Sequence, residues 1–296
     1  MTASPEIRTR QILWSWQGRK LWLGVDEAGS GPSVLLLPAL SSISTRCEMH
    51  PLMKRLAAQA HVIVPDWPGF GDQPRPPIAW TPEALSSFLD HFVQEHVSAL
   101  HGTIAAGHAA TYALYLAAQK PDVLGQLVLI APTWRGPLPT MAGRDRPLFG
   151  TIRWMVDLPV IGPLIYRLNV NPFVVHKMVA GHVYSDPHVL SAEQRRDKQR
   201  VIGSSGARFG SAAFVTGALD RVDSREAFLD LARRIGRGIL VTYGAETPPK
   251  SRAEMEALST SPTVQSLVIP RGKLGVHEEY AAEICPGITG FLFAAR

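Results

Sequence analysis

The sequence is poor in the features that mark secreted or membrane-spanning proteins. Only two of its 296 residues are cysteines, Cys47 and Cys285, which excludes a disulfide framework and indicates a reducing compartment. No uninterrupted apolar run approaches the roughly 20 residues that a transmembrane helix needs. The first residues show neither the basic region nor the apolar region of a secretory signal. We therefore expect a cytoplasmic protein without stable membrane insertion.

Charge of one sign is not concentrated anywhere either. The net charge is +5 and the pI is about 9.4, but lysine and arginine are scattered and form no long block. This distribution argues against a nucleic-acid partner. The sequence also lacks a G-x-G-x-x-G run and a group of metal-ligating residues at a usable spacing. We expect no metal and no cofactor, and the sequence leaves the oligomeric state open.

What the sequence does contain is a regular alternation of apolar strands and helices. It is 46% hydrophobic and 19% charged, which is enough for a large core in one domain with an insertion. The patterns predict strands at 12–16, 20–25, 33–37, 61–65, 102–106, 126–130, 238–243 and 264–269, and helices at 47–60, 82–97, 109–119, 251–258 and 278–294. Such an alternation predicts an α/β fold with a mostly parallel central sheet flanked by helices.

The alternation breaks between residues 134 and 220. There the pattern changes to consecutive helices separated by proline and glycine. We interpret this segment as a helical cap inserted into a core domain made of residues 1–133 and 221–296.

One segment has the layout of a catalytic turn without its catalyst. Gly107-His-Ala-Ala-Thr111 follows an apolar strand and precedes an Ala-rich helix. This is the layout of the nucleophile elbow G-x-S-x-G, in which a sharp turn presents a serine. Ala109 stands at the serine position and Thr111 at the last glycine position. Because alanine has no oxygen, no acyl-enzyme can form at residue 109.

The order of the motifs resembles the α/β-hydrolase superfamily with a cap. Asp66-Trp-Pro-Gly-Phe-Gly71 is similar to the D-x-P-G-F-G turn after the fourth strand of that superfamily. The resemblance implies that His277 is the catalytic base and that Glu246 orients it, with Thr247 as the alternative occupant of the acid position. It also implies an oxyanion hole formed by the backbone amides of Ala110 and of Ala39 or Leu40. The H-G pair that usually marks this loop is absent.

Further residues border the predicted site. Ser41 and His108 lie next to the oxyanion loop and the elbow, where each has either a structural role or a contact with substrate. In the cap, Trp154, Met155 and Tyr166 belong to an apolar series that is either the lining of a pocket or simple packing on the core.

Three functions fit these residues. The first is a hydrolase-type site for an ester, or a related acyl compound, with a hydrophobic body. The second is a serine-independent enzyme, a lyase or a cofactor-free oxygenase, in which His277 abstracts a proton. The third is a non-catalytic protein that binds an apolar small molecule. Ala109 is either an engineered replacement of serine or natural, and the added departures at Thr111, the oxyanion loop and the acid position favour a natural change. The fold alone does not choose among the three functions.

Overall fold

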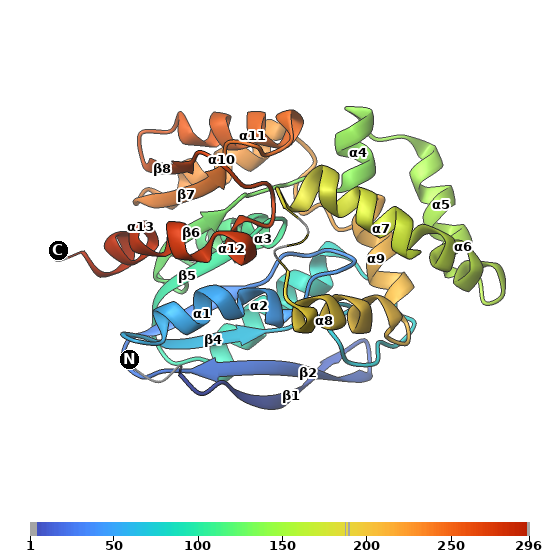
Figure 1. Ribbon diagram of the computed structural model, residues 1–296, viewed down its shortest axis with the longest axis horizontal. Helices are drawn as coiled ribbons and strands as arrows, with labels where there is room; N and C mark the ends of the chain where they lie inside the picture. The colour runs from blue at the N-terminus through green and yellow to red at the C-terminus, as the bar shows by residue number, and fades with distance from the viewer. Residues whose placement is uncertain (1–4, 187, 189, 295–296) are drawn as a thin grey trace.

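The central sheet has eight strands in the order β1-β2-β4-β3-β5-β6-β7-β8 (Figure 1). The structure is a computed structural model that describes residues 5–186, 188 and 190–294. The strands are β1 (Arg8–Trp16), β2 (Arg19–Ala28), β3 (Ser33–Leu37), β4 (His61–Pro65), β5 (Leu100–Ala106), β6 (Gln126–Ile130), β7 (Ile239–Gly244) and β8 (Val264–Ile269). β2 is antiparallel to both β1 and β4, and the remaining pairs are parallel. The predicted fold class, a mostly parallel sheet flanked by helices, is confirmed.

Helices cover both faces of this sheet, which explains the continuous apolar runs. Every residue of β3 is buried, as is almost all of β6, and strands buried on both faces have this composition. One helical layer contains α1 (His50–Leu56), α12 (Val276–Glu279) and α13 (Ala281–Phe293), which contact one another. The other contains α2 (Pro82–His96), α3 (Ala109–Gln119), α10 (Arg225–Ile235) and α11 (Pro249–Ser259).

Two helices that the sequence predicts as continuous are divided. The first begins as a 3₁₀ turn, η1 (Arg46–Met49), and continues as α1, where Pro51 stands in the first helical turn. Proline is tolerated there because the missing N–H has no helical partner, but it separates the helix from the preceding turn. The closing helix is divided at Tyr280 into α12 and α13. As a result Glu48 and His277 each lie on a short turn.

The segment between β6 and α10 is helical throughout most of its length. It contains α4 (Pro137–Ala142), α5 (Pro147–Asp157), α6 (Ile161–Asn169), α7 (Pro172–Met178), η2 (Val179–Val183), α8 (Ala192–Gly203) and α9 (Ala207–Val215). We call residues 134–220 the cap segment. Figure 1 shows α5 and α6 at one edge of the molecule, away from the sheet.

The cap segment contacts the core at the loops that carry the predicted site. The Ser211 hydroxyl on α9 bonds that of Ser42, and the Gly275 amide donates to the carbonyl of Val183 over 2.7 Å. A Cβ at Gly275 would lie 2.5 Å from the Tyr184 ring, so glycine permits this close approach. The end of η2 therefore lies directly over the loop that precedes His277.

Candidate functional site

In the turn after β5, the left-handed backbone conformation does not fall on residue 109. The left-handed conformation falls on Gly107, with φ of +53°, and Ala109 is the first residue of α3. The Ala109 methyl is completely buried. A Cβ added at Gly107 would lie 3.1 Å from the Cβ of Ala39, so the turn and the oxyanion loop are in direct contact. Residue 109 is therefore packed as a core position.

Two of the three amides predicted for the oxyanion hole, those of Ala39 and Ala110, have hydrogen-bond partners within the chain. The Ala39 amide donates to Oε1 of Glu48 over 2.7 Å. The Ala110 amide donates to the Gly107 carbonyl over 3.3 Å, and Leu40 is buried in the core. A carboxylate from η1 thus occupies the place next to Ala39 where a substrate oxyanion would bind in a hydrolase.

The same carboxylate faces the predicted base. His277 Nε2 lies 3.3 Å from Oε1 of Glu48, and each side chain is only 4% exposed. This separation is within ion-pair distance, although the ring N–H is not aligned for a hydrogen bond, and neither ring nitrogen has another partner among the described residues. The structure therefore links Ala39, Glu48 and His277 in one buried group, and Glu48 is a residue that the sequence analysis did not identify.

The surroundings keep Glu48 ionised. Burial raises its pKa, but the neighbouring His277 and the charge of Lys198 outweigh burial, so that the pKa of Glu48 lies below its ordinary value. The Lys198 ammonium on α8 is itself held by Glu278 at 2.9 Å, and Glu278 also accepts a hydrogen bond from the Tyr184 hydroxyl. Burial lowers the pKa of Lys198, but the charges of Glu278 and Glu48 raise it by more than burial lowers it. The pKa of Lys198 is therefore above its ordinary value, and the ammonium stays charged. The cap segment thus contributes a cation to the site.

Among the described residues, neither of the two sequence-based candidates for the acid is hydrogen-bonded or ion-paired to His277. Glu246 accepts a hydrogen bond from the Ser185 hydroxyl, and no ion pair joins Glu246 to His277 in the part of the chain that the structure describes. Thr247 is buried, and its hydroxyl has no hydrogen-bond partner among the described residues. The expected Glu246–His277 pair is therefore replaced by Glu48–His277, because η1 brings Glu48 across the oxyanion loop. The catalytic roles of these residues stay predictions.

His108 contributes to structure on the far side of the turn. Its Nε2 lies 3.1 Å from the Leu219 carbonyl, which the Tyr112 hydroxyl also contacts, and 3.4 Å from Oδ1 of Asp220. Burial lowers the pKa of His108 to about 4 and raises the pKa of Asp220 to about 8. Between these values both groups are uncharged, so the imidazole donates to the carbonyl and attaches the end of the cap segment to α3.

The other predicted lining residues differ in their surroundings. Ser41 bonds Ser44 over 2.8 Å and accepts from the Ile43 amide, which is a turn-forming role. Tyr166 is half-buried and donates to the Ile202 carbonyl, and Met155 is half-buried too, whereas Trp154 is 62% exposed. A cavity of about 610 Å³ opens beside Trp134, Arg153 and Asp220, and its lining includes neither Ala109 nor His277.

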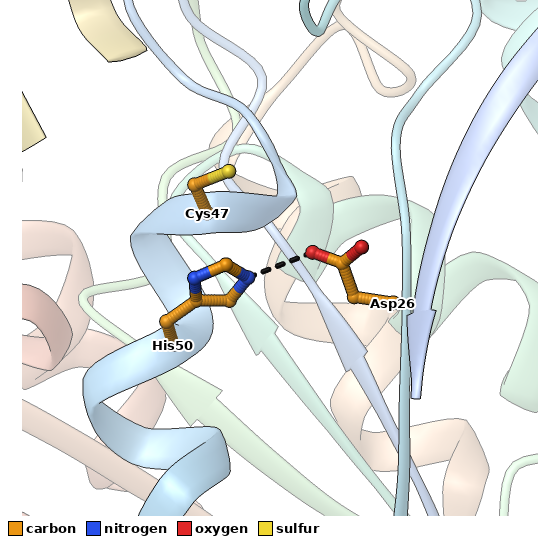
Figure 2. A group of neighbouring side chains, drawn as sticks. All are labelled: Asp26, Cys47 and His50. Carbon is orange, nitrogen blue, oxygen red and sulfur yellow. Dashed lines mark hydrogen bonds and ion pairs between the residues drawn. The ribbon is translucent and has the colours of Figure 1, made fainter. Parts of the chain in front are cut away.

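One group of side chains has the composition of a metal site. Asp26, Cys47 and His50 place one ligand atom each within 4.8 Å of one another (Figure 2). Asp26, however, already accepts from Thr9 and from the Arg46 guanidinium, and its second oxygen lies 2.7 Å from His50 Nε2. Burial raises the pKa of Cys47 to about 12, which disfavours the thiolate that binds metals. These contacts describe a hydrogen-bonded support for η1.

Comparison with known proteins agrees with the fold and the order of the motifs. Residues 34–285 match the sequence model of the alpha/beta hydrolase family. The chain belongs to this family. No curated protein matches the sequence of this hydrolase-family protein.

Solved structures of similar architecture include several enzymes. An esterase from Thermogutta terrifontis superposes with a TM-score of 0.70 at 22% identity, and the match covers 96% of this chain and 98% of that one. The epoxide hydrolase CorEH gives a TM-score of 0.72 at 19% identity, with 98% and 100% covered. The haloalkane dehalogenase DatA from Agrobacterium tumefaciens C58 gives 0.70 at 18% identity, with 96% of each chain covered. At these identities the likeness concerns the fold of the hydrolase-family protein alone.

Proposed function

We propose that this hydrolase-family protein is a serine-independent acid–base enzyme that acts on an uncharged small molecule with an apolar body. His277 is the group that takes and returns the proton, and Glu48 stabilises the charged imidazole. The observation that carries the proposal is the buried contact of 3.3 Å between His277 Nε2 and Glu48 Oε1, next to the Ala39 amide.

The physical argument concerns charge in a buried site. When an imidazole accepts a proton, it becomes a cation, and a neighbouring carboxylate stabilises that cation. The effect is larger in a site shielded from water, where the effective dielectric constant is lower. Glu48 is ionised and buried beside the ring, which supports a role for His277 as a general base.

The same residues argue against acyl transfer. Ala109 lacks a nucleophilic oxygen, and the Ala39 amide is bound by Glu48 rather than free for an oxyanion. The reaction class that remains is one in which His277 removes a proton from water or from a carbon acid. In the hydrolytic version, the activated water attacks the electrophilic carbon and the bond to the leaving oxygen or halide breaks. The imidazolium then returns its proton to an oxygen leaving group or, when a halide leaves, releases it to solvent. Because Glu48 carries a negative charge at the centre of the site, an anionic substrate is disfavoured.

The first experiment measures turnover with short p-nitrophenyl esters, epoxides and haloalkanes, the compound classes named for the structural neighbours. His277→Gln is expected to lower kcat/KM by about 10²- to 10⁴-fold, because it removes the base. Glu246→Gln is the matched control, since Glu246 bonds Ser185 outside the buried group, and it is expected to keep the parental activity. Turnover that survives His277→Gln contradicts the proposal.

Two substitutions separate the role of Glu48 from a purely structural one. Glu48→Gln is expected to lower kcat about tenfold or more with little change in KM, because the imidazolium that forms in the transition state loses its neighbouring charge. Glu48→Asp keeps the charge and is expected to keep most of the parental kcat. A parental kcat in Glu48→Gln, with native circular dichroism, assigns Glu48 to structure alone.

A second candidate function, the binding of a small molecule without turnover, has one observation in its favour. The cavity of about 610 Å³ lies beside Trp134 and Asp220, away from His277. If the whole substrate panel fails, and if ligands raise the melting temperature of the parent and of His277→Gln equally, the binding function replaces the enzymatic one.

A further inference from the structure

The cap segment carries an apolar surface that the core does not cover. Thirteen large hydrophobic side chains are exposed in the described residues, and ten of them lie between residues 141 and 178. They are Met141, Leu148, Trp154, Val160, Ile161, Leu164, Leu168, Phe173, Val174 and Met178. Scattered exposed hydrophobic residues are ordinary, but such a concentration marks an interaction surface. We call residues 141–178, which include α5, α6 and α7, with these side chains the apolar edge.

On α6 the exposed residues form one helical face. Ile161, Leu164 and Leu168 follow the i, i+3, i+7 spacing of a single stripe. Each is more than half exposed, whereas Gly162 is the one residue of this helix that is buried. The stripe therefore points away from the protein, opposite to the usual orientation of an amphipathic helix on its own core.

Unpaired cations accompany the apolar side chains. Arg144, Arg146, Arg153, Arg167 and Lys177 lie in the same stretch, which contains only two acidic residues, Asp145 and Asp157. None of the five cations forms an ion pair with a carboxylate among the described residues. Apolar side chains flanked by free lysine and arginine are the composition of helices that lie in the surface of an anionic bilayer.

The lengths of the helices fit a peripheral position. No single described helix is long and apolar enough to cross a membrane. Helices α5 and α6 together have the length and mean hydropathy of a membrane span, but the chain bends by 113° between them. A nine-residue helix such as α6 is too short to span the roughly 30 Å of a bilayer core. A short helix with an apolar face and a cationic flank lies in the interface instead. Figure 1 shows α5 and α6 at the edge of the molecule.

We propose that the apolar edge docks this protein onto the surface of an anionic lipid bilayer. The side chains of α6 enter the boundary between headgroups and acyl chains, and the five free cations face the lipid phosphates. This inference is independent of the function proposed above, since it uses none of the residues around His277.

Co-sedimentation with lipid vesicles tests the proposal. The full chain is mixed with vesicles of phosphatidylcholine alone or of phosphatidylcholine with phosphatidylglycerol. It is expected to sediment with the anionic vesicles and to be released by high salt, which screens exposed charges. Arg153→Gln with Arg167→Gln is expected to weaken binding about fivefold for each cation removed. Lys54→Gln with Arg55→Gln, two exposed cations on α1, is the matched control and is expected to bind as the parent does.

The apolar contribution has its own pair of variants. Leu164→Glu with Leu168→Glu is expected to weaken vesicle binding at least about tenfold, because two apolar side chains no longer enter the bilayer. Trp22→Glu with Val268→Glu, two exposed residues of β2 and β8, is expected to have no such effect. Since all four residues are exposed, circular dichroism is expected to be native in both variants.

Two results would overturn the proposal. One is a parent protein that does not sediment with anionic vesicles. The other is binding that Leu164→Glu with Leu168→Glu leaves unchanged. If light scattering then shows a dimer that this variant dissociates, the occupant of the apolar edge is a second copy of the chain.

Discussion

At the scale of single residues, Glu48 has the largest consequence. Its Oε1 contacts both the Ala39 amide and the imidazole of His277, to which the sequence resemblance assigns the oxyanion hole and the base. A serine introduced at residue 109 would therefore meet an Ala39 amide that is already hydrogen-bonded to Glu48. Ala109→Ser alone is expected to give no p-nitrophenyl esterase activity above the parent. A clear gain of activity would show that Glu48 leaves the loop when substrate binds.

A pH dependence follows from the buried Asp220. Its pKa is raised by burial to about 8, whereas an unfolded aspartate titrates near 4. The folded protein therefore keeps a proton that the unfolded chain has lost, and its stability falls as the pH rises from about 4 to about 8. Below about 6.5, His108 opposes this trend, because its lowered pKa makes stability rise with pH there. The net fall is thus expected between about 6.5 and 8, at up to about 1.4 kcal/mol per pH unit.

Urea unfolding over this pH range measures the effect. Asp220→Asn removes the titrating group and is expected to abolish the fall in the free energy of unfolding. Asp223→Asn, on the same loop, is the control and is expected to keep the parental slope. A parental slope in Asp220→Asn would show that another group titrates.

The site residues differ in how far the sequence predicts them. His277 follows from the order of the motifs, because it comes after the last strand of a recognisable series. Glu48 does not, because its contact with His277 joins two short turns far apart in the sequence and depends on how η1 packs across the oxyanion loop. One signal was available: Glu48 is the only acidic residue between β3 and β4. A lone carboxylate beside an oxyanion loop warrants attention as a candidate site residue.

At the scale of elements, η1 owes its position to Arg46. The guanidinium pairs with Asp26 at 3.0 Å, with Asp72 at 2.9 Å and with Asp66, whose carboxylate also accepts from the Arg46 amide. A Cβ at Gly24 would lie 2.7 Å from this guanidinium, so the glycine in β2 leaves the space that the Arg46 side chain occupies. The D-x-P-G-F-G motif therefore has a structural role, because its aspartate, Asp66, binds Arg46 and so stabilises η1, the turn that carries Glu48.

Arg46→Met tests this role. The variant leaves the buried Asp66 without its cation and is expected to lower the free energy of unfolding by about 3–5 kcal/mol. Arg10→Met is the control, because the Arg10–Glu27 pair is partly exposed and such pairs contribute about 1 kcal/mol or less. Urea unfolding of the two variants gives the comparison. Equal losses would mean that Arg46 does not hold η1.

The strands follow more directly from the sequence than the ends of the helices do. The run Ser33–Leu37 is too short for a typical helix and is bounded by Pro32 and Pro38, so its length, flanks and apolar composition together predict β3 as a strand buried on both faces. The division of the first helix at η1 depends on contacts of Arg46 with distant carboxylates, which no local pattern encodes. The cap series around Trp154 shows the same limit, because its periodicity identifies an apolar face but not what that face contacts.

At the scale of the whole molecule, burial is distributed unevenly. The core is one continuous cluster that spans the sheet and its helices, whereas a small separate cluster joins Val179, Tyr184 and Leu190 of the cap segment to Ile43 in the loop after β3. Helix α7 has no buried residue, and α6 has only Gly162. A helix with so little apolar burial has little besides its own hydrogen bonds to resist local opening.

Hydrogen–deuterium exchange is expected to reveal this difference. Amides of α6 and α7 open by local unfolding and are expected to exchange orders of magnitude faster than those of β3 and β5, which open only with the whole fold. Peptide-resolved mass spectrometry distinguishes the two regions. If the apolar edge docks on anionic lipid, phosphatidylglycerol vesicles are expected to slow exchange in α5–α7 and leave α10 unchanged, because only the docked helices lose access to water. Equal amide protection in the cap segment and the core of the free protein would contradict the uneven burial. Vesicles that slow amide exchange in α10 as much as in α5–α7 would indicate non-specific adsorption.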